Sequence, residues 1–168
     1  MAWQGRISEA GARIAAHVRR TPVMQVDLGG VPVALKLEQM QHTGSFKARG
    51  AFNTLLQTAV PEAGIVAASG GNHGAAVAYA AARLGHRARI YVPEIAGPSK
   101  IALIRAQGAD LQVVPGAYAE AAARAAEWRV ATGAIEVHPY DAETTVAGQG
   151  TVLAEWEDQG LGAEAVLF

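Results

Sequence analysis

The sequence predicts an α/β protein in which a mostly parallel, twisted sheet is covered by helices on both faces. Short apolar runs that suit buried strands alternate with segments of helical length along the middle of the chain. The expected strands are residues 65–68, 88–92, 110–114 and 134–137. The expected helices are residues 46–58, 72–84, 99–107 and 118–131. Strands that alternate with helices of this length are typical of βαβ units with right-handed crossovers.

Glycine marks two joints between these elements. Gly85 follows one expected helix and precedes the strand at 88–92, and Gly108 stands in the same place before the strand at 110–114. A glycine just past a helix supplies the left-handed turn that ends it, and short connections are usual in βαβ units. The repeated joint therefore supports the α/β prediction.

Further elements are expected on either side of this repeat. Residues 6–19 carry apolar side chains at helical spacing, and Pro22 would end that helix. Residues 33–37 are expected to form a strand and residues 144–158 a helix. Residues 164–168 resemble the start of one more buried strand, so the sequence stops inside an expected element.

The composition excludes several classes of function. The chain has 168 residues, of which 51% are hydrophobic and 17% charged, as in a globular protein with a buried core. A net charge of −1 gives no reason to expect nucleic acid as a partner. The lack of cysteine excludes thiolate nucleophiles and disulfides. We expect a cytoplasmic protein, because neither a secretory signal nor an apolar run of about 18 residues is visible.

Lys47 has an unusual place for a lysine. It follows Thr43-Gly-Ser45-Phe46 and falls in the first turn of the expected helix, which Thr43 or Ser45 could cap. The positive end of a helix dipole disfavours a cation there, and Phe46 adds an apolar neighbour. These surroundings would lower the pKa of the amine and make Lys47 a candidate nucleophile. The alternative is an ordinary solvated lysine.

A glycine-rich turn follows the strand at 65–68. The turn consists of Ser69, Gly70, Gly71, Asn72, His73 and Gly74. Because it joins the carboxyl end of a strand to the start of a helix, it is a candidate cradle for a carboxylate or a phosphate. The alternative is a tight turn with Asn72 as helix cap. His73 is a candidate general base or, alternatively, a structural residue.

Two glycines interrupt the helix expected at 144–158. Gly148 and Gly150 each disfavour a helix by about 1 kcal/mol, so they indicate that a backbone or ligand comes close. Tight packing of the helix is the alternative. No spacing typical of metal ligands stands out, so no metal site is expected.

Taken together, the motifs resemble the fold-type II pyridoxal-phosphate enzymes, and within them the threonine/serine dehydratase and serine racemase group. The matching segments follow the family's order along nearly the whole chain. They are Lys36 to Glu38, Thr43 to Ala51, Ser69 to Gly74, Val92 to Glu94 with Pro98 and Lys100, Gly108 to Asp110, His138 to Asp141 and Ala147 to Thr151. The Ala-Arg-Gly-Ala that follows Lys47 is similar to the dehydratase branch.

The resemblance implies a cofactor and roles for the candidate residues. The cofactor is pyridoxal 5′-phosphate, held covalently by Lys47 with Phe46 packed nearby and Asn72 hydrogen-bonded to its 3′-oxygen. The loop from Ser69 to Gly74, which includes His73, would bind the α-carboxylate of the substrate. Tyr140 would shape the pocket for the substrate side chain.

The implied activity is β-elimination from L-threonine or L-serine, which gives a 2-oxo acid and ammonia. Racemases of this family carry serine where this chain has Gly70, and glycine cannot move a proton, so we expect dehydration to dominate. Elimination from 3-hydroxyaspartate, serine racemisation and an inactive truncated form are the alternatives.

The resemblance also implies a tryptophan synthase β-like architecture. Residues 1–40 would belong to a large domain, residues 41–147 to a small Rossmann-like domain, and residues 148–168 would return into the large domain. Family members continue with a phosphate-binding glycine-rich loop, so we expect this sequence to be a fragment that would bind the cofactor poorly if it ended at Phe168. A homodimer is the assembly that the resemblance implies.

Overall fold

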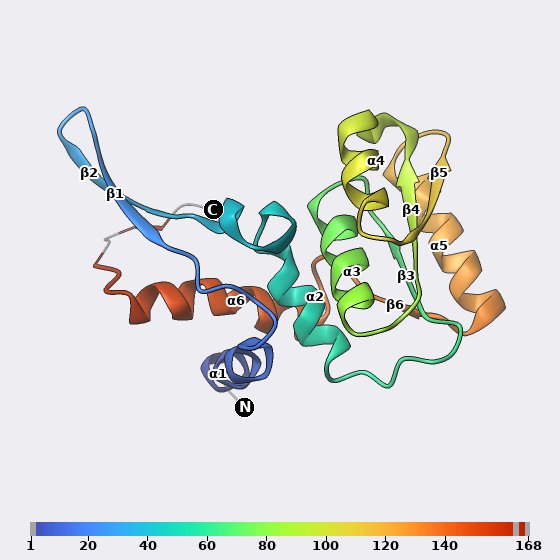
Figure 1. Cartoon of the computed structure of the whole chain (residues 1–168), viewed down its shortest axis with the longest axis horizontal. Helices are drawn as coiled ribbons and strands as arrows, with labels where there is room; N and C mark the ends of the chain where they lie inside the picture. Colours follow the sequence, from blue (N-terminus) through green and yellow to red (C-terminus); the bar gives the residue numbers. More distant parts are fainter. Residues whose placement is uncertain (1–2, 163–164, 167–168) are drawn as a thin grey trace.

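The structure is a computed structural model that describes residues 3–162 and 165–166. A four-stranded sheet and its helices form one end of the molecule, and a β-hairpin with two long helices forms the other (Figure 1). Helix α2 (Lys47–Leu55) lies between the two ends. The strand expected over residues 164–168 lies largely outside the described residues, and the described part of it, 165–166, is not assigned to a strand.

The sheet confirms the predicted parallel arrangement. Its strands are β3 (Ile65–Ala68), β4 (Ala88–Pro93), β5 (Asp110–Val114) and β6 (Ile135–Glu136). They lie in the order β5-β4-β3-β6, and every neighbouring pair is parallel. All four strands occupy the expected places, within one residue except at β6, which is two residues shorter. Their carboxyl ends meet at one edge of the sheet.

Helices cover both faces of this sheet, as expected. Helices α3 (Asn72–Arg83) and α4 (Pro98–Arg105) share one core cluster with β3 and β4. Helix α5 (Tyr118–Thr132) packs on the opposite face, where its Ala121 and Ala125 contact Val66 and Ala68 of β3. The small alanine side chains let the helix axes approach the sheet closely.

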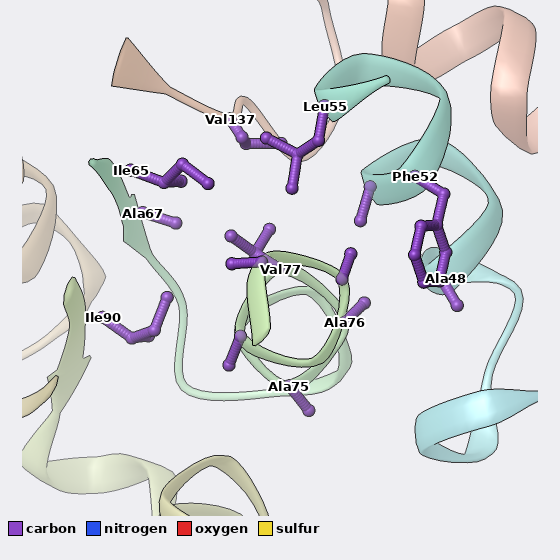
Figure 2. Packing of buried hydrophobic residues seen from close by; sticks show 14 of the residues in the cluster. Ala48, Phe52, Leu55, Ile65, Ala67, Ala75, Ala76, Val77, Ile90 and Val137 are labelled. Carbon is purple, nitrogen blue, oxygen red and sulfur yellow. The ribbon is translucent and has the colours of Figure 1, made fainter. Parts of the chain in front are cut away.

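The main core lies around α3, which is enclosed between the sheet and α2 (Figure 2). Val77 faces the strand residues Ile65 and Ile90, while Ala48 and Phe52 of α2 approach α3 from the other side. From Ala48 to Leu55 every residue of α2 is buried. Helix α2 is therefore an internal element that holds the sheet-bearing part against the rest of the chain.

An antiparallel hairpin precedes α2, and only half of it was predicted. Its strands are β1 (Val23–Leu28) and β2 (Val31–Lys36), joined by Gly29-Gly30. Both glycines have positive φ, as a two-residue hairpin loop requires. The expected strand at 33–37 corresponds to β2, whereas β1 was missed.

Helices α1 (Trp3–Ile14) and α6 (Glu143–Asp158) pack together beside α2. The expected helix at 6–19 begins earlier and ends earlier than the spacing indicated. Its end is not set by Pro22: the backbone N–H of Arg19 donates to the side chain of Gln41 at 2.9 Å, which takes that segment out of the helix. Helix α6 lies within one residue of the prediction.

The glycines of α6 serve helix packing. A Cβ atom on Gly148 would lie 2.7 Å from the backbone oxygen of Arg49 and 2.8 Å from the Cα of Gly50, both in α2. A Cβ atom on Gly150 would lie 2.7 Å from the side chain of Ile7 in α1. The structure therefore supports the tight-packing interpretation, although α6 packs on helices and not on the sheet.

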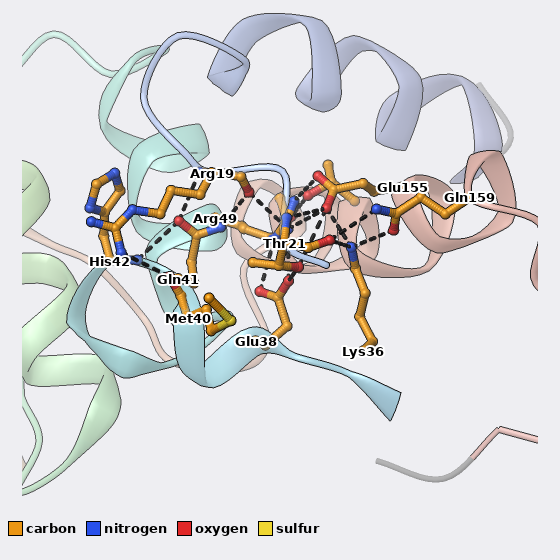
Figure 3. A network of polar contacts seen from close by, with 12 residues as sticks. Arg19, Thr21, Lys36, Glu38, Met40, Gln41, His42, Arg49, Glu155 and Gln159 are labelled. Carbon is orange, nitrogen blue, oxygen red and sulfur yellow. Dashed lines mark hydrogen bonds and ion pairs between the residues drawn. The ribbon is translucent and has the colours of Figure 1, made fainter. Parts of the chain in front are cut away.

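A buried ionic network joins the hairpin, α2 and α6 (Figure 3). The guanidinium of Arg49, whose side chain is 1% exposed, donates to Glu38 at 2.7 Å and to Glu155 at 3.0 Å. The amine of Lys36 lies 2.5 Å from Glu155. Burial alone would raise the pKa of Glu155, but hydrogen bonds and charges from Arg49 and Lys36 outweigh it and lower that pKa. The network therefore ties three separate segments together.

The described residues contain neither a membrane-spanning helix nor a metal-binding cluster. No helix among residues 3–162 is long and apolar enough to cross a membrane. In the same part of the chain, no group of three or more His, Cys, Asp or Glu side chains is placed to hold a metal ion.

Candidate active site

Lys47 is the first residue of α2 and so lies in the first turn, where the sequence predicted it. Its Nζ atom donates to the backbone oxygen of Pro139 at 3.1 Å. The same atom lies 5.1 Å from the ring centre of Phe46 and 4.8 Å from that of Tyr140. Burial lowers the pKa of the Lys47 amine below its ordinary value. The amine is therefore held among aromatic faces at the point where the chain leaves β6.

The predicted capping of α2 is wrong. Phe46 occupies the cap position and provides no side-chain hydrogen bond. The hydroxyl oxygens of Thr43 and Ser45 are instead buried without a hydrogen-bond partner in the described part of the chain. Thr43 also has φ of 62°, which is uncommon for a residue other than glycine. Buried unpaired hydroxyls two and four residues before Lys47 indicate that this segment is shaped around something other than its own helix.

The glycine-rich turn follows β3 and leads directly into α3. Gly71 is the cap residue of α3 and Asn72 its first helical residue, so Asn72 does not cap the helix. The N–H of Gly71 donates to the hydroxyl of Ser69 at 3.2 Å, which fixes the turn. The amides of the first turn of α3 have no acceptor within the helix. Free amides at a helix start suit an anionic group, so the anion cradle at the carboxyl edge of the sheet stays a prediction.

Close packing explains the glycines at both ends of this turn. A Cβ atom on Gly70 would lie 2.6 Å from the Cβ of Ala96. A Cβ atom on Gly74 would lie 2.8 Å from the backbone oxygen of Ser69 and 3.1 Å from Ile104 of α4. The turn is therefore held between the sheet and the segment that leads into α4.

His73 has the features of a structural residue. It is buried, and its Nε2 donates to the backbone oxygen of Val137 at 2.8 Å. The pKa of His73 is lowered to about 4, chiefly by burial; the hydrogen bond to Val137 opposes this effect, and the charges of Lys47 and His138 add to it. An imidazole with this pKa is neutral at pH 7 and a weak base. The geometry therefore favours a role in joining α3 to the end of β6.

The loop after β6 brings Tyr140 to the same place. The Nδ1 atom of His138 accepts from the backbone N–H groups of Tyr140 and Asp141 at 3.1 and 3.0 Å. Tyr140 remains 64% exposed, so its ring covers Lys47 from the solvent side. Gln149 of α6 also donates to the oxygen of Pro139, at 3.3 Å, and so helps to place the acceptor of the Lys47 amine.

A cavity of about 390 Å³ brings these residues together. All the predicted site residues except Phe46 line it: Lys47, Ser69, Gly70, Gly71, Asn72, His73 and Tyr140. Lys100 and Tyr118 line it as well and were not assigned to the site from the sequence. Lys100, like Lys47, stands in the first turn of a helix, and this position could have identified it as a site residue from the sequence. No feature of the sequence around Tyr118 indicated the site.

A larger cavity of about 700 Å³ lies elsewhere, between α1 and α6. None of the predicted site residues lines it. We take the smaller cavity as the candidate site, because there an amine with a lowered pKa meets an anion cradle and two aromatic rings. A lysine of this kind can react with a carbonyl compound, and the free amides can hold the anionic group of a ligand.

Comparison with known proteins identifies the family. Residues 14–167 match the family described as "Pyridoxal-phosphate dependent enzyme". A putative threonine dehydratase of Sinorhizobium fredii is 39% identical over 152 residues, which cover 87% of this chain and 46% of that protein. The biosynthetic L-threonine dehydratase IlvA of Mycobacterium tuberculosis is 42% identical over 158 residues, covering 89% of this chain and 37% of that protein.

Solved structures give the same result. Maize serine racemase superposes with a TM-score of 0.87 at 35% identity, covering 93% of this chain and 49% of the racemase. The chain thus spans half or less of the length of the relatives it matches. The predicted fold class and the resemblance drawn from the motifs are both confirmed. The chain belongs to the pyridoxal-phosphate-dependent enzyme family.

Proposed function

We propose that this protein is a pyridoxal-phosphate-dependent dehydratase that converts L-threonine, L-serine or both to a 2-oxo acid and ammonia. The similarity to two threonine dehydratases supports this substrate class. Because the chain covers less than half of each of them, the activity is proposed for the protein of which this sequence forms the matching part.

The observation that carries the proposal is the environment of Lys47. The sequence contains three lysines, Lys36, Lys47 and Lys100. Lys36 is bound to Glu155 in the ionic network, and Lys100 is exposed. Lys47 alone combines a pKa lowered by burial with contacts to two aromatic rings inside a cavity. We therefore assign to Lys47 the covalent attachment of pyridoxal phosphate.

The residues around Lys47 fit that cofactor. Phe46 and Tyr140 offer aromatic faces beside the amine. The buried hydroxyls of Thr43 and Ser45 have no hydrogen-bond partner among the described residues. We propose that Asn72, which lines the same cavity, donates to the 3′-oxygen of the cofactor. The cofactor, when bound, is the electron sink for a carbanion at the substrate Cα.

The remaining steps belong to side chains and backbone of this chain. The amide cradle between Ser69 and Gly74 would hold the substrate carboxylate and so orient Cα toward Lys47. An amine with a lowered pKa is more readily uncharged, and the Lys47 amine, once the substrate amine had replaced it on the cofactor, could accept the Cα proton. Tyr140 would cover the site from solvent and limit the size of the substrate side chain.

Racemisation is the second candidate, because maize serine racemase is a structural neighbour. A racemase needs a second acid/base group on the face opposite the lysine. Gly70 has no side chain to supply it, and a Cβ there would lie 2.6 Å from Ala96. We therefore propose that elimination is faster than racemisation in this protein. Elimination from 3-hydroxyaspartate remains an alternative within the same chemistry.

We further propose the domain division and assembly. The parallel sheet lies wholly within residues 41–147, the proposed small domain. The hairpin precedes this range, and most of α6 follows it, as parts of the proposed large domain. We also propose that the protein is a homodimer and that it is cytoplasmic. The location is supported by a relative whose name describes it as a biosynthetic enzyme. Light scattering coupled to gel filtration would test the dimer.

The decisive experiment locates the cofactor. The protein is loaded with pyridoxal phosphate, reduced with borohydride and digested, and the labelled peptide is identified by mass spectrometry. We expect the label on Lys47, none on Lys36 or Lys100, and no stable label in Lys47→Ala. Release of ammonia and 2-oxo acid from L-threonine, L-serine and 3-hydroxyaspartate is then compared with formation of D-serine. A label on another lysine, or D-serine formed faster than pyruvate, would contradict the proposal.

A further inference from the structure

Lys100 supplies a positive charge that the mechanism above does not use. The lining of the 390 Å³ cavity includes two lysines and no aspartate or glutamate. Lys47 reacts as an amine, for which the lowered pKa favours the uncharged form, and His73 is neutral at pH 7. Lys100 is exposed, and its side chain is a cation. Within the described lining, the lasting positive charge is therefore that of Lys100.

The placement of Lys100 is unfavourable for an ordinary surface lysine. It is the third residue of α4 (Pro98–Arg105), in the first turn, where the helix dipole repels a cation. Lys47 stands in the first turn of α2 and lines the same cavity. Among residues 3–162 no carboxylate forms an ion pair with Lys100. A bound anion would offset this unfavourable position.

The segment that carries Lys100 runs along the glycine-rich turn. Ala96, four residues before Lys100, lies against Gly70 at the start of the turn. Ile104, four residues after it, lies against Gly74 at the end of the turn. These two contacts hold the first turn of α4 beside the free amides of α3, so the cation and the amide cradle face one cavity.

We propose that Lys100 binds the α-carboxylate of the substrate together with the amide cradle at residues 69–74. This assignment rests on the proposed function, since it concerns the amino acid that the site transforms. The cradle offers neutral donors, and Lys100 adds the charge that distinguishes a carboxylate from an uncharged amide of the same shape.

A pair of matched ligands tests the assignment. L-serine and L-serinamide differ in the charge of the group that Lys100 would contact. For the holoenzyme we expect Lys100→Gln to raise KM for L-serine about three- to tenfold, with kcat changed less than about twofold. KM for L-serinamide should stay the same. Lys100→Arg should keep most of the preference for L-serine.

A binding measurement gives a readout without turnover. L-alanine and L-alaninamide have no β-hydroxyl to eliminate, so their affinity is followed through the absorbance of the bound cofactor. Lys100→Gln should weaken L-alanine about three- to tenfold and leave L-alaninamide unchanged. Added salt should weaken L-alanine binding to the wild type more than to the variant.

The outcomes separate this inference from the proposed function. If the wild type releases no ammonia, the dehydratase proposal fails while the alanine titration still tests Lys100. If Lys100→Gln weakened the binding of L-alanine and L-alaninamide equally, the inference would be overturned, because the role of Lys100 would then not depend on the carboxylate. An increase in KM seen only with 3-hydroxyaspartate would overturn it too, since Lys100 would then bind the side-chain carboxylate of that substrate.

Discussion

The amine of Lys47 donates to the backbone oxygen of Pro139, 92 residues further along the chain, at 3.1 Å. Gln149 donates to the same oxygen at 3.3 Å. The lysine at the start of α2 is thus held by the loop after β6, and that loop is held by α6. The position of the candidate nucleophile therefore depends on how α2 and α6 pack.

That packing can be tested at Gly148. A Cβ there would meet the oxygen of Arg49 at 2.7 Å, so Gly148→Ala should lower the free energy of unfolding by about 1–3 kcal/mol, measured by urea denaturation. Gly11→Ala in α1 is the matched control, because its nearest neighbour would be 3.9 Å away. It should be neutral or stabilising by up to about 1 kcal/mol. Equal effects of the two substitutions on the free energy of unfolding would show that the close contact at Gly148 does not matter for stability.

The contact between Gly70 and Ala96 gives a second prediction. Gly70→Ala places a methyl group 2.6 Å from the Cβ of Ala96, so it should destabilise the protein by about 1–3 kcal/mol. Ala96→Gly in the same chain should recover most of that loss, as thermal unfolding of the single and double variants would show. Full stability of Gly70→Ala alone would refute the steric argument.

The ionic network predicts that replacing a buried arginine lowers the stability of the protein more than replacing an exposed one. Arg49→Met leaves Glu38 and Glu155 without their shared partner, and breaking a buried ion pair from one side destabilises by about 3–5 kcal/mol. Arg124→Met removes a pair with Glu127 in which both side chains are more than 60% exposed, and should change stability by less than about 1 kcal/mol. Urea titrations of both variants measure the difference. Similar values for the two would count against a buried network.

His73 predicts a loss of stability at acidic pH. Its folded-state pKa of about 4 lies below the ordinary value of 6.5, so below pH 6.5 the unfolded chain takes up a proton that the folded chain does not. The stabilisation is present above pH 6.5 and is lost as the pH falls toward 4. Between pH 7 and 4.5 it amounts to about 2–3 kcal/mol.

The variant His73→Gln isolates this contribution. Carboxylates titrate over the same range in both proteins, so the quantity to compare is the change in unfolding free energy from pH 7 to 4.5. The wild type should lose more than the variant. The same loss in both would mean that His73 titrates normally in the folded protein.

The elements that were predicted well are those whose sequence pattern and burial agree. The strands at 65–68 and 110–114 were placed to the residue, since a short apolar run between glycine turns has few other uses. Strand β1 was missed because Val23–Leu28 alternates less clearly, although the Gly29-Gly30 loop was a hairpin signal. The helix ending at Ile14 was drawn too long, because the bond from Arg19 to Gln41 cannot be read from helical spacing.

In the candidate site, too, some features could be predicted from the sequence and others could not. Lys47 and the turn at 69–74 stood out because each departs from what its local position favours. The expected caps Thr43 and Ser45 were wrong, and Asn72 does not cap its helix as the alternative interpretation had it. Capping preference is a local tendency, and here the surrounding fold sets the backbone. The partners of Arg49 come from segments 11 and 106 residues away, so no local pattern could pair them.

Helix α2 has a consequence for how this family can change over time. Its residues from Ala48 to Leu55 are all buried, and Gly50 lies against Gly148 across the interface with α6. A Cβ on Gly148 would meet backbone atoms of Arg49 and Gly50, and a residue smaller than the glycine at position 50 does not exist. Among relatives, glycine should therefore persist at position 148. Substitutions in α2 should be rare among relatives even at positions that do not contact a substrate.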